Sequence, residues 1–278
     1  MDFAAFVAKK EADAARARFS PLLTEIDARP AGAMAIGNDW TRRLFDGDFY
    51  VSPPTGDRPS TSVVFVQSKD GNTGATNPSA LGGGETDKHV IYEGLSRVAA
   101  DAVMAGAGTI RGGKIVLSVW HPELVELRAS LGLPRHPIQI VATLRGLPFE
   151  ESLILNVPEL PVILVTIPTW AALMHAYLEA RPWITPVVMD TPHDLPDALR
   201  RIRALGVQRI SCIGGRTLAG QLIDAGFVDD LYLTTSPQDG GEPNTPFYAK
   251  PLDGCAVVRK VGTGPDAGVR FDHVRLVG

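Results

Sequence analysis

Seven short runs rich in valine and isoleucine recur between residues 62 and 235, and helical segments separate them. The runs are SVVFVQ, ADAVMAG, PIQIVAT, PVILVTI, TPVVMD, QRISCIG and DDLYLTT. The segments near 87–100, 122–131, 169–180, 195–205 and 217–225 have helical patterns. Continuous apolar strands that alternate with helices are typical of a parallel sheet covered on both faces. The sequence therefore predicts an α/β fold with a mostly parallel central sheet and helices on both faces.

The two ends of the chain differ from this central region. Residues 2–18 predict an amphipathic helix, and a stretch rich in proline and glycine follows from Ser20 to Pro59. We expect residues 1–58 to form an N-terminal extension that lies across the main domain or across a dimer partner. A partly disordered arm is an equal alternative. Residues 59–278 are expected to form one domain, whose end, CAVVRKVGTGPDAGVRFDHVRLVG, predicts a C-terminal antiparallel hairpin.

Charge and composition exclude several classes of function. The formal net charge is −4, and no basic cluster provides the positive surface that nucleic-acid binding needs. No run approaches the roughly 18 apolar residues of a membrane span, and the N-terminus has no secretory signal pattern. Cys212 and Cys255 do not form a CxxC pair, and the six histidines lack HxxxH or HExxH spacing. We therefore expect a cytoplasmic protein with no metal site, no membrane and no nucleic-acid partner.

The first loop that can carry chemistry follows the run SVVFVQ. In an open α/β sheet the ligand site lies at the carboxyl ends of the strands, so the loops directly after the strands are the places to search. This loop contains Lys69 and Asp70, whose side chains can exchange protons. We expect them to be the candidate catalytic residues, with ordered water as an alternative proton source. An Asp-Gly pair is also a turn former, so a plain turn is the competing interpretation.

Three further loops after strands predict a site for a phosphate-containing cofactor. Glycines let the backbone approach a phosphate, and an arginine binds a phosphate through two parallel hydrogen bonds. The residues expected at this site are Gly106, Gly108, Thr109, Thr143, Arg145, Gly214, Gly215, Arg216 and Thr217. For Arg145, a solvated loop arginine is an alternative. The pattern is not GxGxxG and has no acidic ribose ligand, which disfavours a Rossmann dehydrogenase, and no G-x-S-x-G motif points to a hydrolase.

Four segments occur in a set order from about Arg58 to about Pro237, roughly two-thirds of the chain. They are Ser68 to Gly71, His89 to Arg97, Ala102 to Arg111, and Gly214 to Gly220 with Ala225 to Leu231. In this order they resemble the reductase domain at the C-terminus of the bacterial deaminase–reductases of riboflavin synthesis. The resemblance implies a dihydrofolate-reductase-like fold, NADPH as the cofactor and a homodimer.

The resemblance also implies site residues. It places Thr109, Thr143 and the Gly214–Thr217 turn near NADPH, and Arg97 near the phosphate of the substrate. A surface arginine on an amphipathic helix is the alternative for Arg97. At the position of Ile213 the family usually has a glutamate that contacts the pyrimidine, so Ile213 is expected at the substrate but without that hydrogen-bond acceptor.

Two further departures from the family pattern follow the second strand. An Asp-Asp-Pro segment of the family is replaced by Gly112-Gly113-Lys114. Shortly afterwards, Trp120 stands where the family has a basic residue for the substrate phosphate. These differences leave the cofactor better supported than the substrate.

Taken together, these features predict an NADPH-dependent reductase that resembles 5-amino-6-(5-phosphoribosylamino)uracil reductase. It is expected to be monofunctional, because no H-x-E motif with a later P-C-x-x-C marks a zinc deaminase and residues 1–58 are too few for that domain. Two alternatives stay open. One is a reductase acting on a pterin or another small heterocycle, and the other is a non-catalytic NADPH-binding protein.

Overall fold

The computed structural model describes residues 2–54, 56–75, 77–111 and 114–277. Its main sheet has the strand order β1-β11-β12-β10-β4-β9-β5-β6-β7-β8. The strands from β10 to β8 in that order are parallel to one another, whereas β12, β11 and β1 join antiparallel. The strands are β1 Leu23–Asp27, β4 Ser60–Gln67, β5 Ala102–Gly106, β6 Ile138–Ala142, β7 Val162–Thr166, β8 Ile184–Val188, β9 Arg209–Cys212, β10 Asp230–Thr235, β11 Gly254–Val261 and β12 Arg270–Leu276.

Every valine- and isoleucine-rich run of the sequence forms one strand of this sheet, and the C-terminal stretch forms the hairpin β11–β12. The predicted mostly parallel sheet with a C-terminal antiparallel hairpin is therefore confirmed. Successive side chains of a strand point to opposite faces of the sheet. Accordingly Val63 and Met104 belong to one core cluster, whereas their neighbours Val64 and Val103 belong to another. Both faces are buried, which explains why the runs lack polar alternation.

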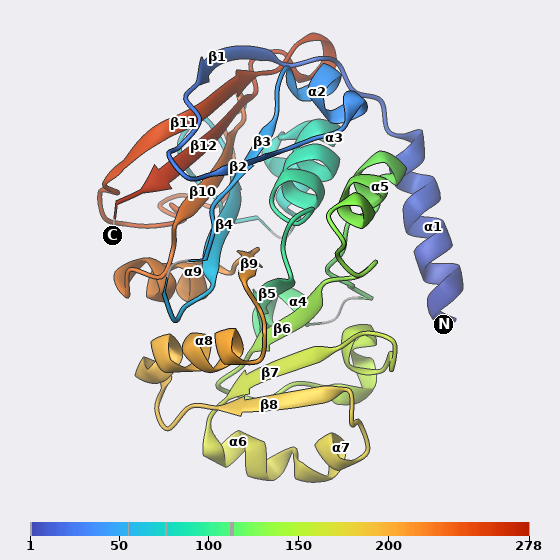
Figure 1. Cartoon of the computed structure of the whole chain (residues 1–278). Helices are drawn as coiled ribbons and strands as arrows, with labels where there is room; N and C mark the ends of the chain where they lie inside the picture. The colour runs from blue at the N-terminus through green and yellow to red at the C-terminus, as the bar shows by residue number, and fades with distance from the viewer. Residues whose placement is uncertain (1, 55, 76, 112–113, 278) are drawn as a thin grey trace.

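Helices cover both faces, as predicted (Figure 1). Helix α8 buries Leu195, Ala198, Leu199 and Ile202, a spacing that forms one apolar stripe, and it shares its core cluster with α9. On the other face lie η2, a π-helix, and α5 (Figure 1). The helices are α1 Phe3–Arg16, α2 Asp39–Phe45, α3 Gly84–Thr86, η2 Asp87–Leu95, α4 Ala107–Ile110, α5 Pro122–Ser130, α6 Pro168–Leu173, α7 His175–Glu179, α8 Leu195–Ala204 and α9 Arg216–Asp224, with short 3-10 turns between them.

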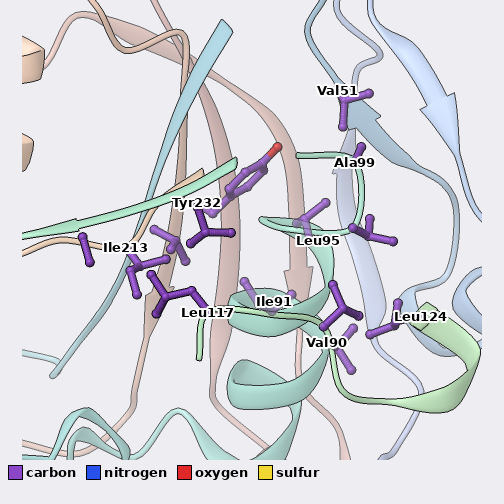
Figure 2. Packing of buried hydrophobic residues seen from close by; sticks show 14 of the residues in the cluster. Val51, Val90, Ile91, Leu95, Ala99, Leu117, Leu124, Ile213 and Tyr232 are labelled. Carbon is purple, nitrogen blue, oxygen red and sulfur yellow. The ribbon is translucent and has the colours of Figure 1, made fainter. Parts of the chain in front are cut away.

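The core on the η2 side extends to the functional region. Figure 2 shows Val90, Ile91 and Leu95 of η2 among the apolar side chains of this cluster, together with Ile213 and Tyr232. Ile213 directly follows β9, so one side of its environment is the core and the other is the carboxyl edge of the sheet. This packing fixes the first turn of η2 relative to the ends of β9 and β4.

Elements before residue 59 pack on this body. Helix α1 lies beside α5 (Figure 1), and β1 pairs with β11 at one edge of the main sheet. A separate two-stranded sheet contains β2, Met34–Ile36, and β3, Phe49–Val51. Part of the expected extension is thus a strand of the main sheet, while the division of the chain at residues 58 and 59 stays a prediction. Within the described ranges, no helix has the length and apolar character to cross a membrane.

Candidate active site

A cavity of about 850 Å³ lies at the carboxyl edge of the parallel strands. Its walls come from β4, the loop after it, η2, the segments after β5, the turn after β9, and helix α1. The segments that line it include residues 64–66, 73–75, 77–79, 87–88, 92–93, 108–109 and 114–117, with Lys10, Arg97, Arg111, Trp120, Ile213, Gly215, Arg216 and Glu242. The predicted substrate residues Arg97 and Ile213 therefore face one cavity.

A second cavity of about 300 Å³ adjoins the first. Gly108, Thr109, Gly215 and Arg216 line both cavities, so the two cavities adjoin at the ends of β5 and β9. The residues predicted for the cofactor that line the smaller cavity are Gly106, Gly108, Thr109, Thr143, Gly215, Arg216 and Thr217. The structure thus brings together most of the residues that the sequence places at a cofactor.

Two of the residues predicted for the cofactor, Gly214 and Arg145, do not line the smaller cavity. Gly214 lines neither cavity, but its carbonyl oxygen accepts a hydrogen bond of 2.9 Å from the Gly106 N–H. Arg145 is exposed and does not line the smaller cavity, although its backbone N–H donates to the Thr143 hydroxyl at 3.3 Å. Gly214 therefore contributes a backbone hydrogen bond between the two strand ends, and Arg145 lies in the loop that follows Thr143.

The smaller cavity has the features that a dinucleotide phosphate requires. Helix α9 begins at Arg216, and its first turn contains neither a side-chain cap at Gly215 nor an acidic residue, so its free N–H groups favour an anion. A Cβ atom built on Gly108 or Gly215 meets nothing within 4 Å, which shows that both glycines face open space. Any larger residue there would fill the cavity, so the glycines keep the backbone accessible to a ligand.

Arg97 is the clearest sign of an anionic ligand in the larger cavity. Only 2% of Arg97 is exposed, and its guanidinium lies 4.1 Å from the centroid of the Tyr92 ring. Nη1 donates to the Ser118 carbonyl oxygen at 2.9 Å, while Nε and Nη2 have no partner among the described residues. A buried charge is stable only with a compensating partner. Because Arg97 is buried, the alternative interpretation as a surface arginine is wrong.

The larger cavity is positively charged although the whole chain has a net charge of −4. Three acidic side chains line it, Asp87, Glu93 and Glu242. Twice as many cationic side chains line it: Lys10, Lys88, Arg97, Arg111, Lys114 and Arg216. None of these six forms an ion pair with another described residue, whereas Glu93 contacts His89 at 2.7 Å. Unpaired like charges around a cavity raise its affinity for anions.

Asp87 provides a titratable carboxyl in the same cavity. Asp87 is partly buried and lines the cavity, and the Thr234 hydroxyl donates a hydrogen bond to it. Burial raises the pKa of Asp87 to about 6, assisted by the nearby negative charge of Asp266 and opposed by the Thr234 hydrogen bond. Asp87 is therefore partly protonated close to neutral pH.

Lys69 and Asp70 lie outside the larger cavity, and Asp70 lines a separate cavity of about 550 Å³ beside the loop after β4. Both are exposed, neither lines the larger cavity, and Lys69 lies 3.9 Å from the exposed Asp239. The reason is that β4 continues to Gln67, and the chain then makes a tight turn in which the Gly71 N–H donates to the Ser68 carbonyl. The turn agrees with the plain-turn interpretation, and a catalytic role of Lys69 and Asp70 stays a prediction.

Five charged residues that line the cavity were not singled out from the sequence, namely Lys10, Asp87, Lys88, Glu93 and Glu242. Asp87 and Lys88 lie on η2 rather than after a strand, and Lys10 lies on the predicted extension. Both helices carry further charged residues, so charge alone does not distinguish these three in the sequence. The replacement at Gly112-Gly113 lies outside the described residues, but Lys114 and Trp120 line the larger cavity. Among the described residues, no group of three His, Cys, Asp or Glu side chains is arranged to hold a metal ion.

The mostly parallel sheet with a C-terminal antiparallel hairpin is the predicted dihydrofolate-reductase-like fold, and the two cavities lie at its carboxyl edge. The family model of the RibD C-terminal domain matches residues 59–260. The chain belongs to this family, that of the riboflavin-biosynthesis pyrimidine reductases. The family resemblance predicted from the sequence is thereby confirmed, whereas the search of curated proteins found no match.

Solved structures share the fold at low sequence identity. A pyrimidine reductase-like protein from Corynebacterium diphtheriae is 19% identical with a TM-score of 0.58, and the match covers 79% of this chain and 92% of that one. The Saccharomyces cerevisiae riboflavin biosynthesis reductase Rib7 is 16% identical with a TM-score of 0.55, covering 80% and 92%. Acinetobacter baumannii RibD is 15% identical with a TM-score of 0.60, covering 80% of this chain but 59% of RibD. This chain thus spans well under two-thirds of that RibD.

Proposed function

We propose that this chain is an NADPH-dependent reductase that acts on a phosphorylated aminopyrimidine of the 5-amino-6-(5-phosphoribosylamino)uracil type. Arg97 is the observation that carries the substrate part of this proposal. Its buried guanidinium has two nitrogen atoms without a partner among the described residues, and it lines a cavity that adjoins a glycine-lined one. A phosphate monoester satisfies such a guanidinium through charge-assisted hydrogen bonds.

The smaller cavity is the proposed cofactor site. The start of α9 and the exposed glycines Gly108 and Gly215 would hold a pyrophosphate, with Thr109, Thr143 and Thr217 as hydroxyl donors. NADPH supplies the hydride when it is bound. The protein supplies the alignment of donor and acceptor, because the residues shared by the two cavities lie between them.

Asp87 is the proposed proton donor of the reaction. When a hydride adds to the carbon of a C=N or C=O group, the π electron pair moves to the nitrogen or oxygen, which then takes a proton. Asp87 faces the cavity and holds its proton with a pKa of about 6, so it is suited to this transfer. The same carboxyl offers a hydrogen-bonding group in a cavity where Ile213 presents none.

Ile213 favours a second candidate substrate class. The residue lines the larger cavity with an apolar side chain, so a pyrimidine N–H that meets it would lose about 1–3 kcal/mol. A reductase acting on a pterin or another heterocycle with a different edge would avoid that loss. Stoichiometric NADPH binding without oxidation by any heterocycle would instead point to a non-catalytic NADPH-binding protein.

NADPH oxidation with freshly generated phosphoribosylaminouracil tests the proposal. We expect turnover by the wild type, and a KM at least about 10-fold higher for Arg97→Ala with unchanged NADPH affinity. Arg97→Lys, which retains the charge, controls for misfolding, and Arg43→Ala, at an exposed arginine of α2 that lines neither cavity, is the matched control. Turnover that is insensitive to Arg97 would refute the substrate site. A homodimer is part of the same proposal, and light scattering measures its mass.

A further inference from the structure

We propose that helix α1 delivers Lys10 to the larger cavity as a second cation for the phosphate that Arg97 binds. This inference rests on the proposed function, because it names a residue of the same substrate site. Lys10 lies outside residues 59–260, the segment that the RibD C-terminal domain model matches. The substrate site of this chain would then be completed by a helix that the family domain does not include.

Lys10 faces the cavity and its charge is available to a ligand. It is partly buried, it lines the same cavity as Arg97, and it forms no ion pair with another described residue. Its ammonium lies 5.8 Å from the centroid of the Phe6 ring, one helical turn away. Its neighbour Lys9 is exposed and does not line the cavity. One lysine of this pair therefore points to the site and the other to solvent.

Two contacts fix α1 against the cavity wall. The Phe6 ring packs edge-on against Trp120 with the ring centroids 5.9 Å apart, and Trp120 itself lines the cavity. Glu11 accepts a hydrogen bond of 2.6 Å from the Arg135 guanidinium. Because these contacts flank Lys10 along the helix, they hold its backbone in a defined position.

The same wall connects α1 to Arg97. Arg135 donates to the Val119 carbonyl oxygen at 2.9 Å and to the Ser118 hydroxyl at 3.3 Å. The Ser118 carbonyl oxygen, in turn, accepts the hydrogen bond from Arg97 Nη1. Residues 118–120 therefore have Arg97 on one side and α1 on the other, so both cations approach the cavity from one wall.

The chemistry of this pair matches a phosphate monoester. Such a group carries close to two negative charges at neutral pH and several acceptor oxygens. Arg97 presents nitrogen atoms in a fixed plane, whereas a lysine ammonium on a flexible stem adjusts to a further oxygen. A buried arginine with a movable lysine is thus suited to the terminal phosphate of a sugar substituent.

The test compares Lys10→Ala, Lys10→Arg and the neighbouring control Lys9→Ala in the full chain. We expect Lys10→Ala to raise the KM for the phosphorylated aminopyrimidine about 10-fold, with kcat unchanged and partial rescue by Lys10→Arg. The KM for the dephosphorylated substrate and the dissociation constant of NADPH should stay at the wild-type values. An equal rise for both substrates would show a structural role, and a weaker affinity for NADPH would show a cofactor role; either would overturn the inference.

Calorimetry with ribose 5-phosphate, with ribose as the blank, separates this inference from the proposed function. Binding of ribose 5-phosphate that Lys10→Ala weakens, in a protein that reduces no aminopyrimidine, would support the phosphate site and refute the substrate. Turnover of the aminopyrimidine with identical KM values for wild type and Lys10→Ala would overturn the inference alone. Absence of both turnover and ribose 5-phosphate binding would overturn both.

Discussion

The Gly106 N–H donates a hydrogen bond of 2.9 Å to the Gly214 carbonyl oxygen, which joins the ends of β5 and β9. These strands are neighbours in the sheet, and the loops that follow them line both cavities. The hydrogen bond places Gly215 and the start of α9 directly beside the loop that contains Gly108. The backbone segments that line the smaller and the larger cavity are therefore held together by this hydrogen bond.

Filling the space at Gly108 should impair cofactor binding without unfolding the protein. A side chain at this position meets no neighbour within 4 Å, so the valine of Gly108→Val projects into the cavities. We expect the affinity for NADPH to fall at least about 10-fold, because the backbone can no longer approach a phosphate, with little change in Tm. Fluorescence titration measures the affinity. Gly220→Ala, in the interior of α9, is the control and should bind NADPH as the wild type does; equal affinities for all three proteins would contradict the cofactor site.

Cofactor choice should depend on the loop after β6. Thr143 lines the smaller cavity, and we expect the guanidinium of Arg145, two residues further on, to bind a ribose 2′-phosphate there. Charge-assisted hydrogen bonds of about 1.5–3 kcal/mol predict that NADPH binds at least about 10-fold tighter than NADH. Arg145→Ala should remove most of that difference. Equal binding of both cofactors by the wild type would show that Arg145 is a solvated loop residue.

The pH dependence of activity should follow Asp87. Its pKa of about 6 means that the protonated fraction declines as the pH rises above that value. We expect kcat/KM of the wild type to fall from about pH 6 upward, and Asp87→Asn to give a lower, flat profile. Initial rates of NADPH oxidation across this range provide the measurement. A wild-type profile that is flat between pH 5 and pH 8 would assign the proton transfer to water.

The same group should affect stability with the opposite sign to an ordinary carboxylate. Its folded pKa lies above the model value of 3.8, so the folded state binds the proton more tightly than the unfolded state. The contribution of Asp87 to the free energy of unfolding therefore decreases as the pH rises from about 4 to about 6. Relative to the wild type, Asp87→Asn should gain in Tm across that window. A Tm difference between the two proteins that does not change with pH would mean that the pKa of Asp87 is not raised.

His121 should destabilise the protein in mild acid. Burial, with a smaller contribution from His89, lowers the pKa of His121 to about 4, and its ring stacks on Trp40 at a centroid distance of 4.2 Å. The unfolded chain takes up this proton near the model value of 6.5, so stability is lost as the pH falls from there toward 4. His121→Phe keeps the stacking without the titration. We expect the variant to lose less Tm than the wild type between pH 7 and pH 5; parallel losses in both proteins would exclude this group as the cause.

The central sheet could be predicted because its strands are buried on both faces and therefore consist of continuous apolar runs. Strand β1 escaped prediction because Leu23–Asp27 is largely exposed and mixes apolar with acidic residues. The short strands β2 and β3 carry too few residues for a periodic pattern. Hydrophobic pattern thus identifies interior elements, whereas edges are defined by tertiary pairing.

The residues of the site also fall into those that the sequence could place and those that it could not. Residues directly after strands, such as Gly108, Gly215 and Ile213, could be placed because parallel strands bring their carboxyl ends together. Arg97 was found through family resemblance and not through any periodicity. Asp87 and Lys10 reach the cavity from helices, and their positions depend on packing between segments far apart in the chain. A local sequence pattern does not predict contacts between such distant segments.

The two outer strands of the main sheet affect how this chain can associate with itself. Strand β8 contains Pro186, which has no N–H to offer to a further strand. At the opposite edge, β1 has an irregular register between Thr24 and Ile26, and the Thr24 N–H already donates to Asp46. Both borders therefore resist β-augmentation and the fibrillar assembly that follows from it. The sheet would therefore end within each molecule and would not continue into a second copy.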